Sequence, residues 1–165
     1  MAPPKFNKLE AMTICGTPEY IAPEVILGKR YNQSVDFYGL GLLIFEMLSG
    51  YNPYKIQNYG NNTNMMFEMI VSERVEFSFP KKYFNDDAKH LVKQLMQKNP
   101  RKRLGNGSNG IDEIKQHPFF KGIDWEELSS RTMEVPFKPN MESDIDTKYV
   151  DKEFLKQSKK DKRGF

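Results

Sequence analysis

The strongest hydrophobic pattern in the chain runs through residues 35–48, VDFYGLGLLIFEML, where apolar side chains occupy most positions. Ser34 precedes this run as a candidate N-cap, Asp36 falls in the first turn and Gly50 follows the end, so the run predicts a helix over 35–48. A helix that is apolar around its whole circumference is normally buried on every side. The amphipathic helices elsewhere are few and short, and we therefore expect this helix to lack some of its packing partners within the chain.

Three further segments carry helical signals. Thr63 is a candidate N-cap for a short helix that ends at Val71. Asn85 is a candidate N-cap for a helix over 86–97, whose apolar residues form one stripe: Leu91, Val92, Leu95 and Met96. A short helix is predicted over 111–116, before a proline. No segment shows the clear alternation of a strand, so the sequence predicts a mainly α fold.

The remaining segments lack a helical period. Residues 1–12 form an irregular leader, and residues 13–33 are punctuated by glycine and proline, as loops are. Residues 121–155 are mixed, with two prolines that stiffen an extended stretch. The segment KQSKKDKR, within 156–165, holds five basic side chains and one acidic side chain, which predicts a disordered basic end.

Composition narrows the class of protein. The 165 residues are 38% hydrophobic and 28% charged, which is typical of a globular protein, and the net charge of +3 is too balanced to indicate nucleic-acid binding. The single cysteine, Cys15, excludes an internal disulfide and favours a reducing compartment. The N-terminus has no signal-peptide pattern, and no apolar run approaches the ~20 residues of a membrane span. We expect an intracellular protein, cytoplasmic with the nucleus as a second compartment, with no nucleic-acid partner and no membrane segment.

Short motifs that suggest cofactor chemistry lack its context. GNGSNG, residues 105–110, has the G-x-G-x-x-G spacing, but no strand precedes it, so a flexible glycine turn is the favoured interpretation. DFYG, residues 36–39, resembles a metal-binding Asp-Phe-Gly motif, yet it falls inside a predicted helix rather than on a loop. His90 and His117 have no cluster of further ligands along the sequence, and we predict surface or capping roles for both.

A series of motifs then resembles, in order, the second half of the AGC group of serine/threonine protein kinases. TICGTPEYIAPEV resembles the end of the activation loop with its Ala-Pro-Glu motif, and SVDFYGLGLLIFEMLSGYNPY resembles the central helix of the C-terminal lobe. DAKHLVKQLMQKNPRKRLG and IKQHPFFKGIDWEEL resemble the later helices, while VPFKPN and DTKYVDKEF resemble the C-terminal tail of that group. Within that group, the series looks like protein kinase B. The resemblance covers a partial kinase domain over 13–120 and a tail extension over 121–155, and leaves out residues 1–12.

This resemblance implies a helical, partial kinase-like C-terminal lobe with an extended C-terminal tail and no N-lobe sheet. The parent reaction is phosphoryl transfer from Mg·ATP to Ser or Thr of protein substrates near basic residues. The family performs it with a glycine-rich phosphate loop, a strand lysine, a His-Arg-Asp loop and an Asp-Phe-Gly loop. None of these matches the 165 residues in a suitable setting. We therefore expect no catalytic residue, no cofactor site and no metal site in this chain. Two classes stay open: a fragment of a kinase, and a non-catalytic binding or decoy module.

Residues near the start of the resemblance match regulatory and substrate-binding positions of the family. Thr13 matches the activation-loop phosphorylation site, which an upstream activating kinase would modify. The apolar pocket for the substrate residue after the phosphoacceptor is matched by Ile14, Pro18 and Ile21. Thr17 matches the residue that steadies the catalytic aspartate. For these residues the alternative interpretation is ordinary loop packing.

Charged residues match four further positions. Glu24 matches the Ala-Pro-Glu carboxylate and Arg103 matches its buried partner in a structural ion pair. Asp36 matches the aspartate that anchors the catalytic loop. Glu46, in the apolar context LLIFEML, matches the family's acid that binds an arginine of the substrate upstream of the phosphoacceptor. A carboxylate and a guanidinium suit this role, since they form bidentate pairs. The alternative for Glu46 is a partly exposed helix glutamate. Val150 stands where the family's tail usually has a phenylalanine that reaches the nucleotide pocket.

Overall fold

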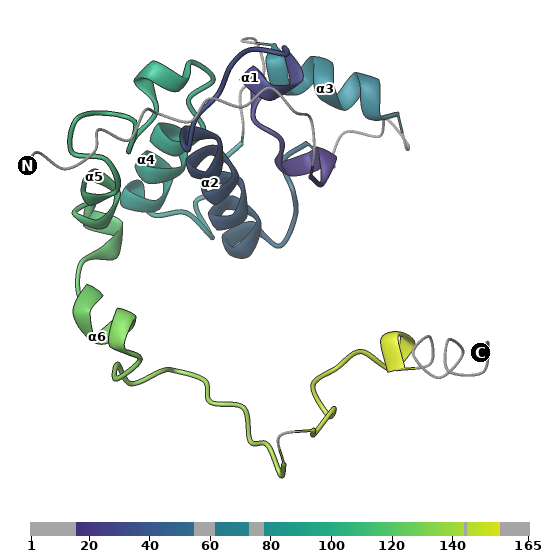
Figure 1. Ribbon diagram of the computed structural model, residues 1–165, viewed down its shortest axis with the longest axis vertical. Coiled ribbons are helices and arrows are strands. Elements are labelled where there is room, and N and C mark those ends of the chain that lie inside the picture. The colour runs from purple at the N-terminus through teal and green to yellow at the C-terminus, as the bar shows by residue number, and fades with distance from the viewer. Residues whose placement is uncertain (1–15, 55–61, 73–77, 144, 156–165) are drawn as a thin grey trace, which may run out of the picture. The chain divides into compact units, whose positions relative to one another are not determined.

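The computed structural model of the chain describes residues 16–54, 62–72, 78–143 and 145–155. These residues form helices and turns, and no strand is assigned among them, which confirms the mainly α class. Contacts divide the chain into two compact units, Met1–Ile123 and Asp124–Phe165. The helices of each unit can be followed in Figure 1.

The first unit holds most of the regular structure. Its elements, in chain order, are η1 (Pro18–Tyr20), α1 (Pro23–Ile26), α2 (Ser34–Ser49), α3 (Thr63–Val71), α4 (Asp86–Leu95), η2 (Pro100–Lys102), α5 (Ile111–Lys115) and η3 (Pro118–Phe120), where η marks a 3₁₀ turn. The second unit holds α6 (Trp125–Ser130). None of the helices in the described part of the chain is long and apolar enough to cross a membrane.

Helices α2 and α4 lie side by side and form the centre of the first unit (Figure 1). The predicted stripe of α4 is buried, with three of its four side chains fully shielded from solvent. The facing side chains of α2 that pack into the same core are Tyr38, Leu42 and Phe45. Gly41 allows this close approach, because a Cβ built on it would lie 2.8 Å from Cγ of Met96 and 2.9 Å from Cβ of Leu95.

We expect Gly41→Ala to destabilise the first unit relative to Gly39→Ala by about 1–3 kcal/mol, the usual cost of overpacking. Both substitutions remove a helix-interior glycine and gain about 1 kcal/mol of helix propensity. A Cβ on Gly39 meets only the carbonyl oxygen of Tyr20, at 3.9 Å, so Gly39→Ala is the matched control. Urea denaturation of both variants measures the difference, and equal stabilities would show that α2 and α4 can separate without cost.

Helix α2 is apolar around most of its circumference but is not buried on every side. Leu43 is 46% exposed and Met47 is 76% exposed, and these two residues lie one helical turn apart on the same face. Helix α4 covers the side of α2 that carries Leu42 and Phe45. Among the described residues, no element covers Leu43 and Met47 to the same extent. Partial exposure of this helix agrees with the expectation that the chain lacks some of its packing partners.

One of the three predicted N-caps is confirmed by the structure, and two are wrong. Asn85 caps α4 as predicted, since its side chain accepts a hydrogen bond from the backbone N–H of Ala88 at 2.7 Å. The predicted caps Ser34 and Thr63 are wrong, because both residues are the first residues inside their helices. An asparagine side chain just upstream accepts the free N–H groups instead: Asn32 at the start of α2, and Asn62 at the start of α3. Helix α4 also ends two residues earlier than predicted, and α5 one residue earlier.

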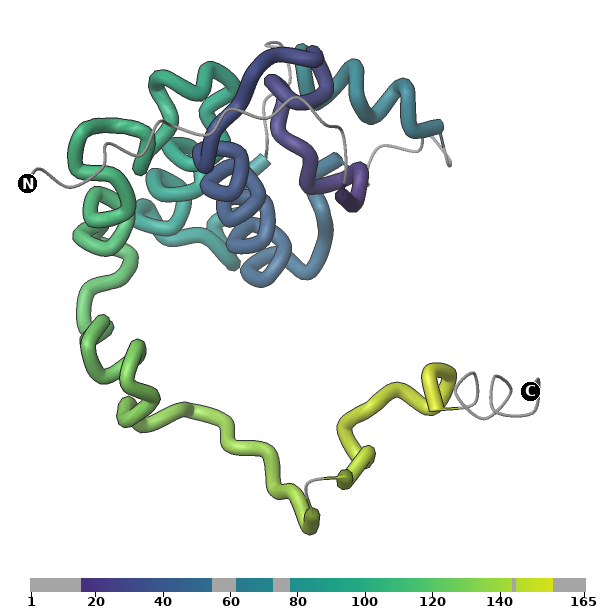
Figure 2. Tube along the Cα trace, viewed as in Figure 1, coloured from purple at the N-terminus to yellow at the C-terminus, as the bar shows by residue number. Residues whose placement is uncertain are grey.

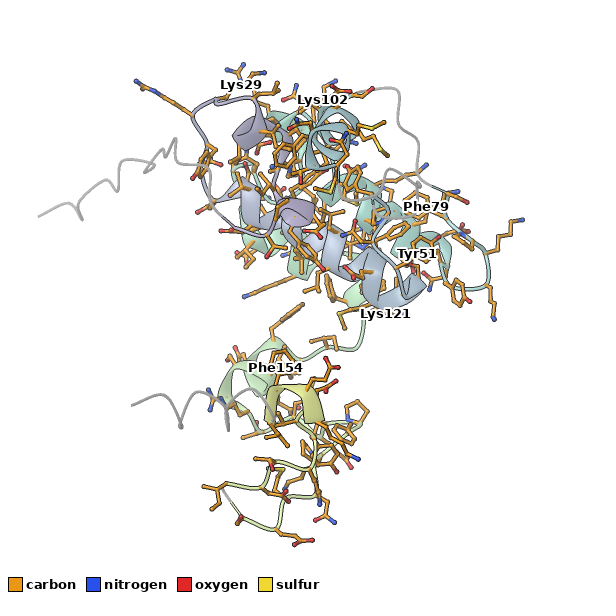
Figure 3. The ribbon with its side chains drawn as sticks, turned by 90° about the vertical axis from the view of Figure 1, so that its right-hand side faces the viewer. Lys29, Tyr51, Phe79, Lys102, Lys121 and Phe154 are labelled. Atoms are coloured by element: carbon orange, nitrogen blue, oxygen red, sulfur yellow. The ribbon has the colours of Figure 1, made fainter. Side chains whose placement is uncertain are left out.

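An aromatic cluster closes the C-terminal end of α2. The ring of Phe45 lies 5.6 Å from the rings of Tyr51 and Phe79 and 5.1 Å from the ring of Phe84. Figure 2 traces the backbone of the first unit. In Figure 3, the labels of Tyr51 and Phe79 lie in the same region of that unit. These aromatic residues hold the segment before α4 against the end of α2.

Of the short elements, α5 was predicted, whereas η1, α1 and α6 were not. Both η1 and α1 lie within residues expected to be irregular, and α6 lies in a segment that was described only as mixed. Each begins with a recognisable start signal: a proline at the first helical position for η1 and α1, and the Asp124 side chain, which caps α6.

In the second unit, the carboxylate of Asp146 accepts hydrogen bonds from the backbone of Glu142 and Lys148 and orders a turn.

Candidate functional site

A cleft of about 430 Å³ lies in the first unit, between the chain around η1 and the first turns of α2. Three residues predicted for substrate or catalytic-loop contacts line it: Thr17, Ile21 and Asp36. Its remaining lining residues are Gly16, Tyr20, Ala22, Val25, Tyr31, Val35 and Gly39. Pro18 is half-buried at the start of η1, and Thr13 and Ile14 lie outside the described residues. The cleft therefore combines apolar walls with a hydroxyl and a carboxylate at its edge.

Local backbone bonds shape the wall of the cleft formed by residues 17–29. The N–H of Tyr20 donates to the carbonyl of Thr17 at 3.0 Å, which closes η1, and the N–H of Lys29 donates to the carbonyl of Glu24 at 2.9 Å. Pro18 and Pro23 occupy first helical positions, where a residue without an N–H is tolerated. The resulting turns bury Ile21, Ala22 and Val25, so this wall is fixed to the core.

The structure brings Glu24 and Arg103 together although they are far apart in sequence. Nη1 of Arg103 donates to Oε1 of Glu24 at 2.6 Å, and Nη2 donates to Oε2 at 2.9 Å, which is a bidentate pair. Both residues are buried, with 2% and 3% of their surfaces exposed. Arg103 also donates from Nη1 to the carbonyl of Ser34 at 2.8 Å and from Nε to the carbonyl of Gln97 at 2.9 Å. One guanidinium thus joins α1, the start of α2 and the segment after α4.

Two buried tyrosines extend this network into the core. The guanidinium of Arg103 lies 5.1 Å from the ring centroid of Tyr38, and the hydroxyl groups of Tyr38 and Tyr54 are 2.6 Å apart. Burial, followed by the neighbouring Tyr54, raises the pKa of Tyr38 well above its usual value, and burial raises the pKa of Tyr54 to about 12. Both hydroxyl groups therefore stay neutral near pH 7, and Glu24 is the residue that balances the charge of Arg103 within the described part of the chain.

Glu46 is half-buried near the C-terminal end of α2 and contacts the cleft through Tyr20. The hydroxyl of Tyr20, a residue that lines the cleft, donates a short hydrogen bond to Oε2 of Glu46. Tyr20 was not predicted as a site residue, because no signal in the sequence links it to Glu46, which lies 26 positions away on a different element. The contact orients Oε2 of the carboxylate, and no hydrogen bond from the described residues is assigned to Oε1.

The two short motifs that resemble cofactor sites, DFYG and the glycine turn at 105–110, are not placed as such sites require. DFYG lies within α2, as predicted, with its aspartate exposed on the first turn. In the glycine turn at 105–110, the N–H of Gly105 donates to the carboxylate of Glu113 at 3.2 Å, so a carboxylate of the same chain already occupies a donor that a phosphate would use. No group of three His, Cys, Asp or Glu side chains in the described ranges is arranged to hold a metal ion. As the structure places them, neither the glycine turn nor DFYG fits Mg·ATP.

Comparisons with known proteins give one consistent family. The protein kinase domain matches residues 4–120 of the chain, beginning within the segment that was read as a leader. RAC serine/threonine-protein kinase of Drosophila melanogaster is 42% identical over 146 residues, which cover 88% of this chain and 23% of that protein. Serine/threonine-protein kinase gad8 of Schizosaccharomyces pombe is 43% identical over 145 residues, which cover 88% and 24%. RAC-beta serine/threonine-protein kinase of Homo sapiens is 38% identical over 146 residues, which cover 88% and 29%. The chain spans about a quarter of the length of these relatives.

Proposed function

This chain belongs to the protein kinase family, and from that premise we propose that it is the substrate-docking C-lobe portion of an AGC-group serine/threonine kinase, followed by the tail of that group over 121–155. The reaction it serves is phosphoryl transfer from Mg·ATP to Ser or Thr in protein segments that contain basic residues. We assign it to the cytoplasm and the nucleus, the compartments in which its protein substrates and an upstream activating kinase would meet it.

The contact between Glu46 and Tyr20 is the observation that carries this proposal. A half-buried carboxylate in an apolar helix is costly unless it has a charged or hydrogen-bonding partner, and Tyr20 supplies a single neutral donor. A guanidinium from a substrate arginine would add the positive charge, with the planar fork of donors that matches a carboxylate. Glu46 therefore serves as the arginine-binding residue beside the cleft.

The walls of the cleft support a second contact with the substrate. Ile21 is buried at its apolar side, where it would receive the residue after the phosphoacceptor together with Ile14 and Pro18. Thr17 and Asp36 supply the polar edge, where they would steady the catalytic aspartate and anchor the catalytic loop of a kinase. Thr13 would be the site that an upstream kinase modifies.

The chain by itself does not carry out the transfer step in this proposal. In this proposal, phosphoryl transfer uses the family's phosphate loop, strand lysine, His-Arg-Asp loop and Asp-Phe-Gly loop, none of which matches this sequence in a suitable setting. A second candidate function is a non-catalytic module that binds substrates or regulators of a kinase and competes for them; the contact between Tyr20 and Glu46 beside the cleft would support it equally. Both functions use the cleft and Glu46, and they differ in whether a catalytic half acts beside them.

Peptide titration tests the docking site. We expect a labelled peptide with an arginine upstream of its serine to bind the chain about tenfold more tightly than the same peptide with citrulline, because one charge-assisted hydrogen-bonded pair is lost. Glu46→Gln should remove this preference, and Tyr20→Phe should weaken it by a smaller factor, as seen by fluorescence anisotropy.

Glu126→Gln, a substitution of an exposed helix glutamate in the second unit, is the matched control and should keep the preference. An equal affinity for both peptides in the unaltered chain would refute the assignment of Glu46. A preference that survives in Glu46→Gln would mean that another carboxylate binds the arginine.

A further inference from the structure

Two histidines form a contact that the proposed function does not use. His90 lies in α4, and His117 immediately precedes η3. Nδ1 of His90 and Nε2 of His117 are 2.7 Å apart, while the ring centroids are 5.1 Å apart and the ring planes differ by 16°. Because two rings in face-to-face contact cannot bring their atoms this close, the imidazoles meet edge to edge. One hydrogen atom therefore lies between the two nitrogens.

The neighbouring backbone determines where that hydrogen belongs. The N–H of Phe119 donates to Nδ1 of His117 at 3.2 Å, so Nδ1 carries no hydrogen. A neutral His117 must then carry its hydrogen on Nε2, from which it donates to Nδ1 of His90. His90 in turn is protonated on Nε2 when it is neutral. The result is a relay of two hydrogen bonds that runs from the backbone of η3 through both rings to α4.

Any further proton breaks one bond of this relay. If it binds Nδ1 of His117, it faces the N–H of Phe119, donor against donor. If the proton binds Nδ1 of His90, it faces the hydrogen on Nε2 of His117, again donor against donor. His117 can avoid this only by carrying its hydrogen on Nδ1 instead, where that hydrogen faces the backbone N–H of Phe119. The intact relay therefore exists only when both rings are neutral.

We propose that His90 and His117 form a proton-sensitive latch, which holds η3 on α4 when both rings are neutral and releases η3 when an additional proton binds. The chain continues through η3 to Asp124, the first residue of the second unit, so the latch controls the anchoring of the segment that leads into that unit.

The surroundings of His117 set the direction of the pH response. The residue is buried, and burial, followed by the charge of His90, lowers the pKa of its imidazole, while Asp87 of α4 opposes this effect. The other charged residues near it in sequence are Lys115, at the end of α5, and Lys121, just after η3. Since the folded-state pKa is below the unfolded value of 6.5, the unfolded segment binds protons first as pH falls. The latch is therefore fully stable above pH 6.5 and loses stability as pH falls from 6.5 through the lowered pKa, by up to tenfold in its equilibrium constant per pH unit.

The test follows η3 and the two rings in the full chain by NMR between pH 7.5 and 5. We expect both imidazoles to carry hydrogen on Nε2 at pH 7.5, and the Phe119 amide to lose protection against hydrogen exchange, after correction for intrinsic rates, with the midpoint of the His117 titration. His117→Asn should keep η3 capped through its side-chain oxygen and make the protection independent of pH, because asparagine is a strong cap that does not titrate.

His90→Gln is the second variant, and its site is exposed, so it does not disturb the core. This substitution replaces the ring of His90 with a neutral acceptor, so the pKa of His117 should rise towards 6.5. The pH at which η3 is released should rise with it. Constant protection of Phe119 in the unaltered chain would overturn the latch. So would a His117 titration at or above 6.5, or a loss of protection in His117→Asn at the same pH as in the unaltered chain.

Discussion

Glu24→Ala is expected to lower the free energy of unfolding by about 3–5 kcal/mol, the cost of leaving a buried charge without its partner. The guanidinium of Arg103 keeps its two carbonyl acceptors but loses both oxygens of the carboxylate, and its side chain has no exposed surface through which water could compensate. Urea denaturation followed by circular dichroism measures the change. Glu24→Gln, which keeps the shape and one acceptor but not the charge, should lie between the alanine variant and the unaltered chain.

A double-mutant cycle separates the pair from its surroundings. Arg103→Ala should also be strongly destabilising, since it leaves Glu24 buried and the carbonyl of Ser34 without its donor. The double variant removes both charges and should cost much less than the sum of the two single changes. Additive effects would show that the two residues act independently, which the 2.6 Å and 2.9 Å contacts argue against.

The second large effect concerns nucleotide binding. We expect the purified chain to show no saturable binding of Mg·ATP below millimolar concentration and no transfer of label to an arginine-containing peptide. Phosphoryl transfer depends on positioned cations and a catalytic base, and the chain offers neither a lysine in a suitable strand nor a His-Arg-Asp loop. We do not expect the glycine turn to replace a phosphate loop, because the carboxylate of Glu113 accepts the hydrogen bond of the Gly105 N–H and would repel a phosphate there.

Calorimetric titration with Mg·ATP, followed by a radiolabel assay, gives the measurement, with a full-length RAC kinase as the positive control. Phosphorylation of Thr13 should not change the result, because ordering a loop does not create a nucleotide site. Submillimolar binding, or label transfer that Glu46→Ala abolishes, would contradict the expectation and require a catalytic centre that uses other residues.

Local sequence signals were sufficient for the longer helices. The apolar run at 35–48, the stripe on α4 and the asparagine before Asp86 each predicted an element that the structure contains. The errors lie at the boundaries, where Asn32 and Asn62 supply the capping oxygens and the nearer Ser34 and Thr63 do not. Side chains of similar capping strength compete within two residues, and backbone geometry decides among them. Turns of three or four residues, such as η1 and α1, are too short to show a period.

The sequence by itself determined the helical class, the apolar centre of α2 and α4 and, through an ordered series of motifs, the kinase family. By resemblance alone, it also predicted an ion pair for Glu24 and Arg103 and an arginine-binding role for Glu46. The pairing of Glu24 with Arg103, 79 positions apart, was expected from the family resemblance, and the structure supplies its bidentate geometry. The tertiary structure alone decided two other contacts between distant residues: Tyr20 with Glu46 across 26 positions, and His90 with His117 across 27. Helix signals act over a few residues, where the backbone fixes their spacing. A contact between elements depends on how whole helices pack, and residue spacing along the chain carries no record of that packing.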